Sequence, residues 1–374
     1  MTRRGGLSDV LVSACALLGV PGTADRLRLA ELVGAPRRIC VLLVDGLGYH
    51  LLPQAAPHAP LLADVLAGRT GALHELGCSF PSTTPTSLTT LATGVLPGAH
   101  GVLGFTVNVP GTERVLTHVA WRDDPTPREW QPVPSLFDRA AAAGTRVSVV
   151  SRPEFAGSGL TVAAYGTPRY VGAEHAEQLA EQMLAELAAG PGLVYGYHPT
   201  LDAVAHQHGI ASPDWARAAA AVDRLITRIA DGLPEDAALF VTADHGALDV
   251  PADGRIDLDA DPRLTAGVRV VAGEPRARYL HTVPGSTADV LATWRELLAG
   301  RARVLGREEA VAAGLFGAVP EEHLPRIGDV VVIAEGDTVI LASAHEPESV
   351  GKLVAYHGAL TAAETAIPLI SLGG

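Results

Sequence analysis

The sequence predicts an α/β protein built on a doubly wound, mostly parallel sheet. Two observations predict this class. Short apolar runs rich in branched residues recur along the first two thirds of the chain, as expected for strands that are buried on both faces. The segments between these runs have helical periodicity and several end at glycine, so strands and helices alternate. With 374 residues, the chain is long enough for one large domain or two modest ones.

The N-terminal segment is predicted to be a helix. Ser8-Asp9 opens an apolar stretch as a helix cap would, and the turn at 19–22 closes it. A basic segment before an apolar stretch, here Thr2-Arg3-Arg4, is also typical of signal peptides. Because of the capping signals we expect an amphipathic surface helix and a cytoplasmic protein.

Four apolar runs are predicted as buried parallel strands, the first of which ends at Asp45-Gly46. Their ranges are 38–44, 146–151, 192–197 and 238–242. Helical patterns between them cover 135–143, 173–189 and 213–229. The last of these begins at Ser212-Pro213, a pair typical of a helix N-terminus.

Beyond about residue 250 the pattern changes to shorter strands, typical of an antiparallel α+β unit. These strands are predicted at 268–272, 277–282, 329–334 and 338–343, with a helix at 287–299. Glu335-Gly336-Asp337 predicts a hairpin between the last two strands. The chain then returns to a core-like element at 352–358. We therefore expect a core over 1–250, completed by 346–374, and a cap-like insertion over 251–345.

Composition excludes several classes of partner. The formal net charge is −13, which disfavours binding to a nucleic-acid duplex or an anionic membrane surface. A small phosphate ligand remains compatible, since bound cations can invert the local field. No apolar run approaches the length of a membrane span. The three cysteines are predicted to be reduced and mostly buried, without a disulfide framework.

Residues 80–94 place a hydroxyl where a helix begins. Thr84 is predicted as the N-cap and Pro85 as the first helical residue. Unpaired N–H groups and the positive end of the helix dipole favour an oxyanion there. A hydroxyl at such a place can act as a nucleophile if a metal lowers its pKa. Taken alone, Thr84 is better explained as a simple helix cap than as a nucleophile.

Residues of metal-binding type follow the ends of three predicted strands, and a further histidine lies near the C-terminus. Each pattern alone is more often a turn, a surface pair or a structural histidine. Together they give six nitrogen and oxygen ligands without a thiolate, which suits two zinc ions or similar ions with open positions. Two ions roughly 4 Å apart can hold both the attacking and the leaving oxygen of a phosphoryl displacement. The six residues are Asp45, Asp202, His206, Asp244, His245 and His357.

In this order the motifs resemble those of the alkaline phosphatase superfamily, and within it the type I phosphodiesterase/nucleotide pyrophosphatase family. The resemblance covers about 38–250 and 352–370. It rests on Asp45-Gly46, Phe80-Pro81-Ser82-Thr83-Thr84, Thr93-Gly94 with Pro97 and His100-Gly101, the Asp202 and His206 pair, Thr242-Ala243-Asp244-His245-Gly246, and His357-Gly358.

The resemblance implies an alkaline-phosphatase-like core and a hydrolase in which Thr84, rather than Thr83, is the nucleophile. It implies one ion held by Asp202, His206 and His357, and a second held by Asp45, Asp244, His245 and Thr84. A phospho-threonine would form and then be hydrolysed. Ser87 stands where the family often has an asparagine that binds a phosphate oxygen, and a serine offers a shorter reach.

The expected activity is hydrolysis of a phosphodiester or nucleotide pyrophosphate bond in a small substrate. A phosphomonoesterase or phosphonate hydrolase using the same site is the alternative, and a catalytically silent metal-binding protein is a third. A threonine nucleophile disfavours a sulfatase and a phosphoglycerate mutase. A monoester dianion usually needs a cation, and the candidates in space are Arg122, Arg152, Arg276 and Arg278. The sequence indicates neither the physiological substrate nor the oligomeric state.

Overall fold

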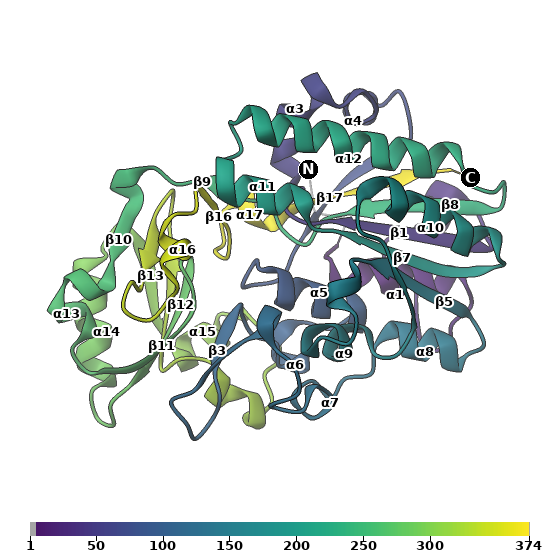
Figure 1. Cartoon of the computed structure of the whole chain (residues 1–374). Coiled ribbons are helices and arrows are strands. Elements are labelled where there is room, and N and C mark those ends of the chain that lie inside the picture. The colour runs from purple at the N-terminus through teal and green to yellow at the C-terminus, as the bar shows by residue number, and fades with distance from the viewer. Residues whose placement is uncertain (1–4, 374) are drawn as a thin grey trace.

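A seven-stranded sheet forms the centre of the protein (Figure 1). The computed structural model describes residues 5–373, so Thr2-Arg3-Arg4 lie outside the described residues. Within this part of the chain, β17 runs opposite to the other six strands of the sheet, which share one direction. The strands, in spatial order, are β2 (Ala72–Gly77), β17 (Ala366–Leu372), β8 (Ala237–Thr242), β1 (Arg38–Val44), β7 (Gly192–His198), β5 (Arg146–Ser151) and β6 (Arg169–Gly172). The predicted doubly wound, mostly parallel sheet is confirmed.

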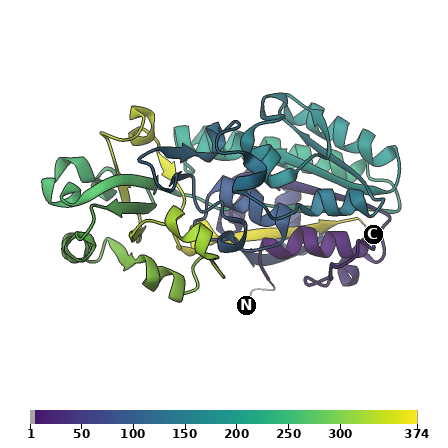
Figure 2. The same ribbon diagram turned by 90° about the horizontal axis from the view of Figure 1, so that it is seen from below.

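Helices cover both faces of the sheet (Figures 1 and 2). One layer contains α1 (Ser8–Leu17), α5 (Thr84–Thr93), α8 (Leu136–Ala142) and α9 (Gly159–Tyr165). The other contains α3 (Leu52–Ala55), α4 (Pro60–Leu66), α10 (Ala176–Ala188), α11 (Thr200–His208) and α12 (Pro213–Asp231). Short helices at the periphery of the core are α2 (Ala30–Val33), α6 (Pro97–His100), α7 (Pro127–Trp130), α16 (Glu348–Gly351) and α17 (Ala362–Thr365). The predicted cap of α12 is present, since Ser212 accepts a hydrogen bond from the N–H of Trp215 at 3.1 Å.

The first helix, α1, is more buried than its sequence pattern predicts. We expected an amphipathic surface helix opened by Ser8, but six consecutive residues of α1, 10–15, are buried. Ser8 is the first helical residue, and Leu7 occupies the N-cap position. The helix contacts both α5 and α8, so it is enclosed on more than one side. An apolar run enclosed in this way does not need a polar face.

Three strands of the main sheet were not predicted, and each has a weak local signal. β2 is mostly half-buried and lies at one edge of the sheet. β6 is a short strand at the opposite edge. β17 is fully buried but contains Pro368, a residue that usually argues against an inner strand.

The segment after residue 250 forms a separate four-stranded antiparallel sheet. Its spatial order is β11 (Val268–Glu274), β12 (Ala277–Thr282), β14 (Val330–Ala334) and β13 (Ala302–Gly306). α14 (Thr287–Leu297) packs against β13 and β14. Shorter elements around it are β10 (Arg255–Asp257), α13 (Pro262–Thr265) and α15 (Arg307–Ala312). An α+β unit is present as predicted, while the boundaries at 251 and 345 stay a prediction.

One detail of this region was predicted wrongly. Glu335-Gly336-Asp337 does not close a hairpin, because β14 already has β12 and β13 on its two edges. The following strand, β15 (Val339–Leu341), instead pairs in parallel with β10. The predicted core-like element at 352–358 is buried from residue 355 onward. It contains β16 (Ala355–Tyr356), which pairs with β9 (Leu248–Asp249).

The α+β unit is attached to the core by buried polar contacts. Arg276 and Glu364 are both fully buried and form an ion pair at 2.6 Å. Arg326, in a 3-10 turn at Glu321–Arg326, stacks on the ring of Trp130 at 3.6 Å and donates to the carbonyl of Gly101 at 2.8 Å. Apolar residues of both parts share one cluster, which includes Phe80, Leu103, Tyr279, Phe316 and Val331. These contacts hold the second sheet beside the carboxyl edge of the first.

Two compositional predictions can be compared with the structure. None of the cysteines in the described part of the chain forms a disulfide; Cys15 and Cys40 are buried and Cys78 is half-buried. Within residues 5–373, none of the helices has both the length and the apolar composition that crossing a bilayer requires.

Candidate metal centre

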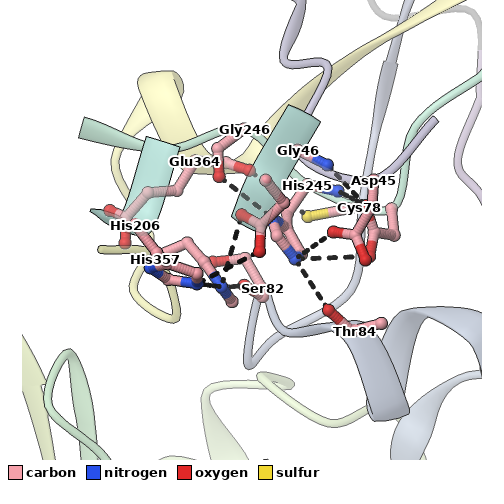
Figure 3. A network of polar contacts seen from close by, with 12 residues as sticks. Asp45, Gly46, Cys78, Ser82, Thr84, His206, His245, Gly246, His357 and Glu364 are labelled. Atoms are coloured by element: carbon pink, nitrogen blue, oxygen red, sulfur yellow. Dashed lines mark hydrogen bonds and ion pairs between the residues drawn. The ribbon is translucent and has the colours of Figure 1, made fainter. Parts of the chain in front are cut away.

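The predicted ligands converge at the carboxyl edge of the main sheet. Asp45 follows β1, and Asp244 and His245 follow β8, the neighbouring strand. Asp202 and His206 lie four residues apart on α11, which follows β7 on the other side of β1. His357 follows β16, and the N-terminus of α5 brings Thr84 to the same place (Figure 3).

These side chains form two groups that could each hold a metal ion. We call Asp45, Asp244 and His245 the acidic group, and Asp202, His206 and His357 the imidazole group. In each group one ligand atom from every residue lies within 4.8 Å of the others. The rings of His245 and His357 stack at a centroid distance of 3.6 Å, so the two groups are adjacent.

All three imidazoles are oriented in the way that metal ligands require. His245 donates its Nδ1–H to the carbonyl of Gly246 at 3.0 Å, His206 to Ala355 at 2.8 Å, and His357 to Ser82 at 2.8 Å. A carbonyl can only accept, so Nδ1 carries the proton in each ring. Nε2 of every ring therefore faces the site, and this second-sphere contact is typical of histidines that bind metals.

The carboxylates present unpartnered oxygens to the same space. Oδ1 of Asp45, Oδ1 of Asp202 and Oδ2 of Asp244 are buried and have no hydrogen-bond partner within the described residues. The second oxygen of Asp244 accepts from the N–H groups of Gly46 and His245 at 3.1 and 3.0 Å. Buried acceptors without a donor are costly, so the chemistry of this donor set fits bound cations.

The two groups differ in the pKa values of their acids. Burial, and then the carboxylates of Asp244 and Asp202, raise the pKa of Asp45 well above its ordinary value. Burial and the carboxylate of Asp202 raise the pKa of Asp244 to about 6. Burial also opposes ionisation of Asp202, but the charge of His206 outweighs it and the pKa of Asp202 is lowered.

The imidazoles differ in the same way. Burial would lower the pKa of His206, but the carboxylate of Asp202, 3.1 Å away, raises it to about 9. Burial lowers the pKa of His245 to about 4 and that of His357 to about 3. Without a metal, the imidazole group therefore contains an ion pair, whereas the acidic group has no cation of its own.

Thr84 faces the acidic group. Its hydroxyl lies 3.2 Å from Nε2 of His245, and Figure 3 shows the two side chains pointing toward each other. Since Nε2 is unprotonated, the hydroxyl donates this hydrogen bond. The hydroxyl of Thr83, by contrast, is buried and has no hydrogen-bond partner among the described residues. The geometry thus gives Thr84, and not Thr83, access to the ligands.

The cap assignment at this helix was wrong by one residue. Thr83 has the extended conformation of an N-cap, Thr84 is the first helical residue and Pro85 the second. The helix start has no side-chain cap, so the hydroxyl of Thr84 is not used to close it. Ser87 is fully buried and its hydroxyl has no partner among the described residues. A contact of Ser87 with a phosphate oxygen stays a prediction.

An apolar slot opens beside Thr84, with a volume of about 150 Å³. Three tyrosines, Tyr165, Tyr170 and Tyr197, form much of its wall, and the other lining residues include Phe155 and Leu160. The tyrosine hydroxyls all bond to protein groups: Tyr165 to Tyr195, Tyr170 to the carbonyl of Arg152, and Tyr197 to Asp45. The tyrosines therefore present ring surfaces rather than polar groups to a ligand.

The four candidate arginines are differently placed. Arg276 and Arg278 are buried and form ion pairs with Glu364 and Glu346. Arg122 is exposed, and Arg152 bonds to Glu154 and to the hydroxyl of Thr200 at the start of α11. None of the four lines the slot.

Sequence reasoning missed the groups that orient the ligands. Tyr197 donates to Asp45, and the N–H of Gly46 donates to Asp244. A tyrosine in a buried apolar run gives no local sign of such a contact. Its position five residues before Asp202, at the end of a strand next to β1, is the one signal that could have suggested it.

Comparisons with known proteins agree with this fold. The family model for type I phosphodiesterase/nucleotide pyrophosphatase matches residues 39–360. Ectonucleotide pyrophosphatase/phosphodiesterase 1 of Saccharomyces cerevisiae is 27% identical over 208 residues, which are 46% of this chain and 28% of that protein. The present chain thus matches less than a third of the length of this relative.

Solved structures with similar folds include a murine and a bacterial protein. Murine ectonucleotide pyrophosphatase/phosphodiesterase 5 has a TM-score of 0.70 at 19% identity, covering 90% of this chain and 88% of that one. An inactive variant of that protein has been solved in complex with AMP. Phosphonoacetate hydrolase from Sinorhizobium meliloti 1021, in complex with phosphonoacetate, has a TM-score of 0.67 at 22% identity, covering 90% of each chain. These structures share the fold, and the match over residues 39–360 shows that the chain belongs to the type I phosphodiesterase/nucleotide pyrophosphatase family.

Proposed function

We propose that this protein is a two-zinc hydrolase of phosphodiester or nucleotide pyrophosphate bonds, with Thr84 as its nucleophile. The strongest support is the hydroxyl of Thr84, which lies 3.2 Å from Nε2 of His245 and beside carboxylate oxygens without partners. One ion would be held by the acidic group and Thr84, the other by the imidazole group. Bound zinc would lower the pKa of the hydroxyl and offset negative charge on the phosphoryl oxygens.

The residues of the chain would divide the reaction between them. Oγ1 of Thr84 attacks phosphorus and its proton passes to solvent. The bond to the leaving group breaks on the opposite side, its electron pair stays on the leaving oxygen, and a phospho-threonine forms. Water then attacks the same phosphorus, which releases the second product and restores the hydroxyl. The N-terminus of α5 directs its N–H groups and the positive end of its dipole toward the transferred phosphoryl group.

The slot beside Thr84 favours a diester over a monoester. A diester has a second substituent on phosphorus, and a planar apolar one would lie against the tyrosine rings of the slot. AMP, which is bound to an inactive variant of the murine relative, is itself a monoester, and it supports only the binding of a planar ring attached to a phosphate. A monoester or a phosphonate with a carboxylate carries more charge and would need a cation, whereas Arg276 and Arg278 are already in ion pairs.

One assay tests this function. The zinc-loaded protein would be given bis(4-nitrophenyl) phosphate, 4-nitrophenyl phosphate and phosphonoacetate at the same pH and zinc concentration. We expect the highest kcat/KM with the diester and little turnover of phosphonoacetate. A clear preference for the monoester would make the protein a phosphatase, and turnover of phosphonoacetate alone would make it a phosphonate hydrolase.

A further inference from the structure

Tyr197 belongs both to the slot and to the metal centre. It is the second-last residue of β7, where it lies beside Leu43 of β1 in the parallel register. Its hydroxyl donates to Oδ2 of Asp45, just beyond the end of β1. Its ring lines the slot beside Thr84, with the ring of Phe155 at a centroid distance of 6.1 Å. A single buried side chain therefore joins the two parts of the site.

The hydrogen bond of Tyr197 determines which oxygen of Asp45 faces the ligands. Oδ2 is occupied by the phenol, while Oδ1 has no partner and lies 3.5 Å from Nε2 of His245. Without the phenol, the carboxylate could rotate and share either oxygen with the site. The bond thus limits Asp45 to one oxygen directed at the acidic group, as contacts behind a ligand commonly do.

The other tyrosines of the slot have no such contact. The hydroxyl of Tyr165 meets that of Tyr195 at 3.2 Å, and the hydroxyl of Tyr170 donates to the carbonyl of Arg152 at 2.6 Å. Among the tyrosines that line the slot, only Tyr197 bonds to a candidate ligand. Tyr165 is therefore a matched control, because it has the same kind of ring in the same wall and its hydroxyl bonds elsewhere.

We propose that Tyr197 is a positioning residue that orients Asp45 for the ion of the acidic group while its ring forms a wall of the substrate slot. This inference rests on the proposed two-metal function. It predicts that the two roles can be separated. Loss of the hydroxyl should weaken one ion and leave the other ion and the slot unchanged, because the imidazole group has no contact with Tyr197 among those described.

The test compares Tyr197→Phe with Tyr165→Phe and the wild-type protein. Zinc affinities would be measured by competition with a chromogenic chelator, and cobalt-loaded samples would be compared by visible absorption. We expect Tyr197→Phe to lower the affinity of one of two sites by roughly 10- to 100-fold. Tyr165→Phe should keep both affinities. On an aryl diester at subsaturating zinc, Tyr197→Phe should lower kcat while KM changes less than twofold.

A double-mutant cycle with Asp45→Asn tests whether the effect of Tyr197→Phe on zinc affinity arises through Asp45 or from a general loss of stability. If Tyr197 acts through Asp45, Tyr197→Phe should have little further effect on zinc affinity in the Asp45→Asn protein. Equal zinc affinities in Tyr197→Phe and the wild type, or equal losses at both sites, would overturn the inference alone. A wild-type protein that binds no zinc would overturn the two-metal function, and the inference with it.

Discussion

The acidic and imidazole groups are in contact through the stacked rings of His245 and His357, but they differ in how their charges are balanced. In the imidazole group, Asp202 and His206 form an ion pair at 3.1 Å. In the acidic group, Asp45 and Asp244 are close together and the adjacent His245 is neutral at ordinary pH. The imidazole group is thus stable by itself, whereas the acidic group is complete only with a bound cation.

The acidic and imidazole groups also differ in solvent exposure. Asp244 and His245 are 0% exposed, while His206 is half-buried. Thr84 faces the acidic group, so the proposed nucleophile lies at the group that depends most on an ion. This arrangement links reactivity to metal loading, because a hydroxyl beside two carboxylates gains nucleophilic character only when a cation offsets their charge.

The largest expected effect is on turnover. Thr84→Ala removes the hydroxyl but none of the carboxylate or imidazole ligands, so zinc content should stay near that of the wild type. Turnover of the diester should fall by roughly 10³-fold or more, as loss of a covalent nucleophile usually causes. Steady-state kinetics and elemental analysis of the same samples measure both quantities.

Thr83→Ala is the control for this variant. Its hydroxyl is buried and makes no hydrogen bond to any of the six candidate ligands among the described residues, so most of the activity should remain. If Thr83→Ala were inactive and Thr84→Ala active, the assignment of the nucleophile would be wrong by one residue. If Thr84→Ala lost both ions, the loss of turnover would be explained by the loss of metal, and it would not support Thr84 as the nucleophile.

The second prediction concerns metal-free stability, where the two groups should respond with opposite signs. The pKa of Asp244 is about 6, against an ordinary value of 3.8. Because the folded pKa lies above the ordinary value, ionising Asp244 at pH 8 costs folding free energy. Asp244→Asn removes this cost and can keep the hydrogen bonds from Gly46 and His245, so the metal-free variant should be more stable than the wild type.

Asp202→Asn should do the reverse. It leaves the imidazolium of His206 without its partner and should destabilise the metal-free protein by about 2 kcal/mol at pH 7. Urea unfolding of chelated samples measures both variants. Changes of the same sign in the two proteins would contradict the difference in charge balance between the groups.

The pH dependence of metal-free stability should show the same two groups in separate windows. The raised pKa of Asp244 contributes stability below pH 3.8 that is lost as pH rises through about 6, and Asp45 acts in the same direction. The raised pKa of His206 contributes stability below pH 6.5 that is lost as pH rises through about 9. Asp244→Asn should weaken the first decline, and His206→Gln the second.

Bound zinc should oppose the decline of stability with rising pH. The ions bind the folded protein and need deprotonated ligands, so stabilisation by zinc should grow between pH 5 and 8. Melting temperatures of chelated and zinc-loaded samples across this range measure the difference. A constant difference over the whole range would mean that zinc binding does not displace protons from these residues.

The sequence predicted what is local and failed where distant segments must pair. Residues 38–44 and 192–197 are strands because continuous apolar runs suit a sheet covered on both faces. Asp45, Asp244 and His245 could be named because they follow such strands directly. The pairing of β14 with β12 and β13 could not be predicted, since a turn-like Glu335-Gly336-Asp337 gives no information about which strand edges are already occupied.

The same limit applies to the site. The Asp202 and His206 pair has a helical spacing that can be seen in the sequence, but the contact of Tyr197 with Asp45 joins residues 152 positions apart. The slot likewise collects residues from several elements around α5 and α9. Ligand types therefore follow from the sequence, whereas their orientation and the shape of the substrate slot depend on the packing of the whole core.

The smallest expected effect is that of Ser87→Ala, which tests whether α5 contributes to phosphoryl binding independently of the two metal groups. If the hydroxyl of Ser87 donates one hydrogen bond to a phosphoryl oxygen, Ser87→Ala should lower kcat/KM by roughly fivefold, the equivalent of about 1 kcal/mol. Thr86→Val is the matched control, because its hydroxyl is also buried without a partner in the same turn of α5. Zinc content should not change in either variant, since both side chains lie outside the two ligand groups. Equal kinetics for Ser87→Ala and the wild type would show that the metal centre and the N–H groups of α5 bind the phosphoryl oxygens without Ser87. If Ser87→Ala instead lowered kcat/KM as much as Thr84→Ala does, Ser87 would take part in the chemical step. The site would then consist of the two metal groups and a third group on α5.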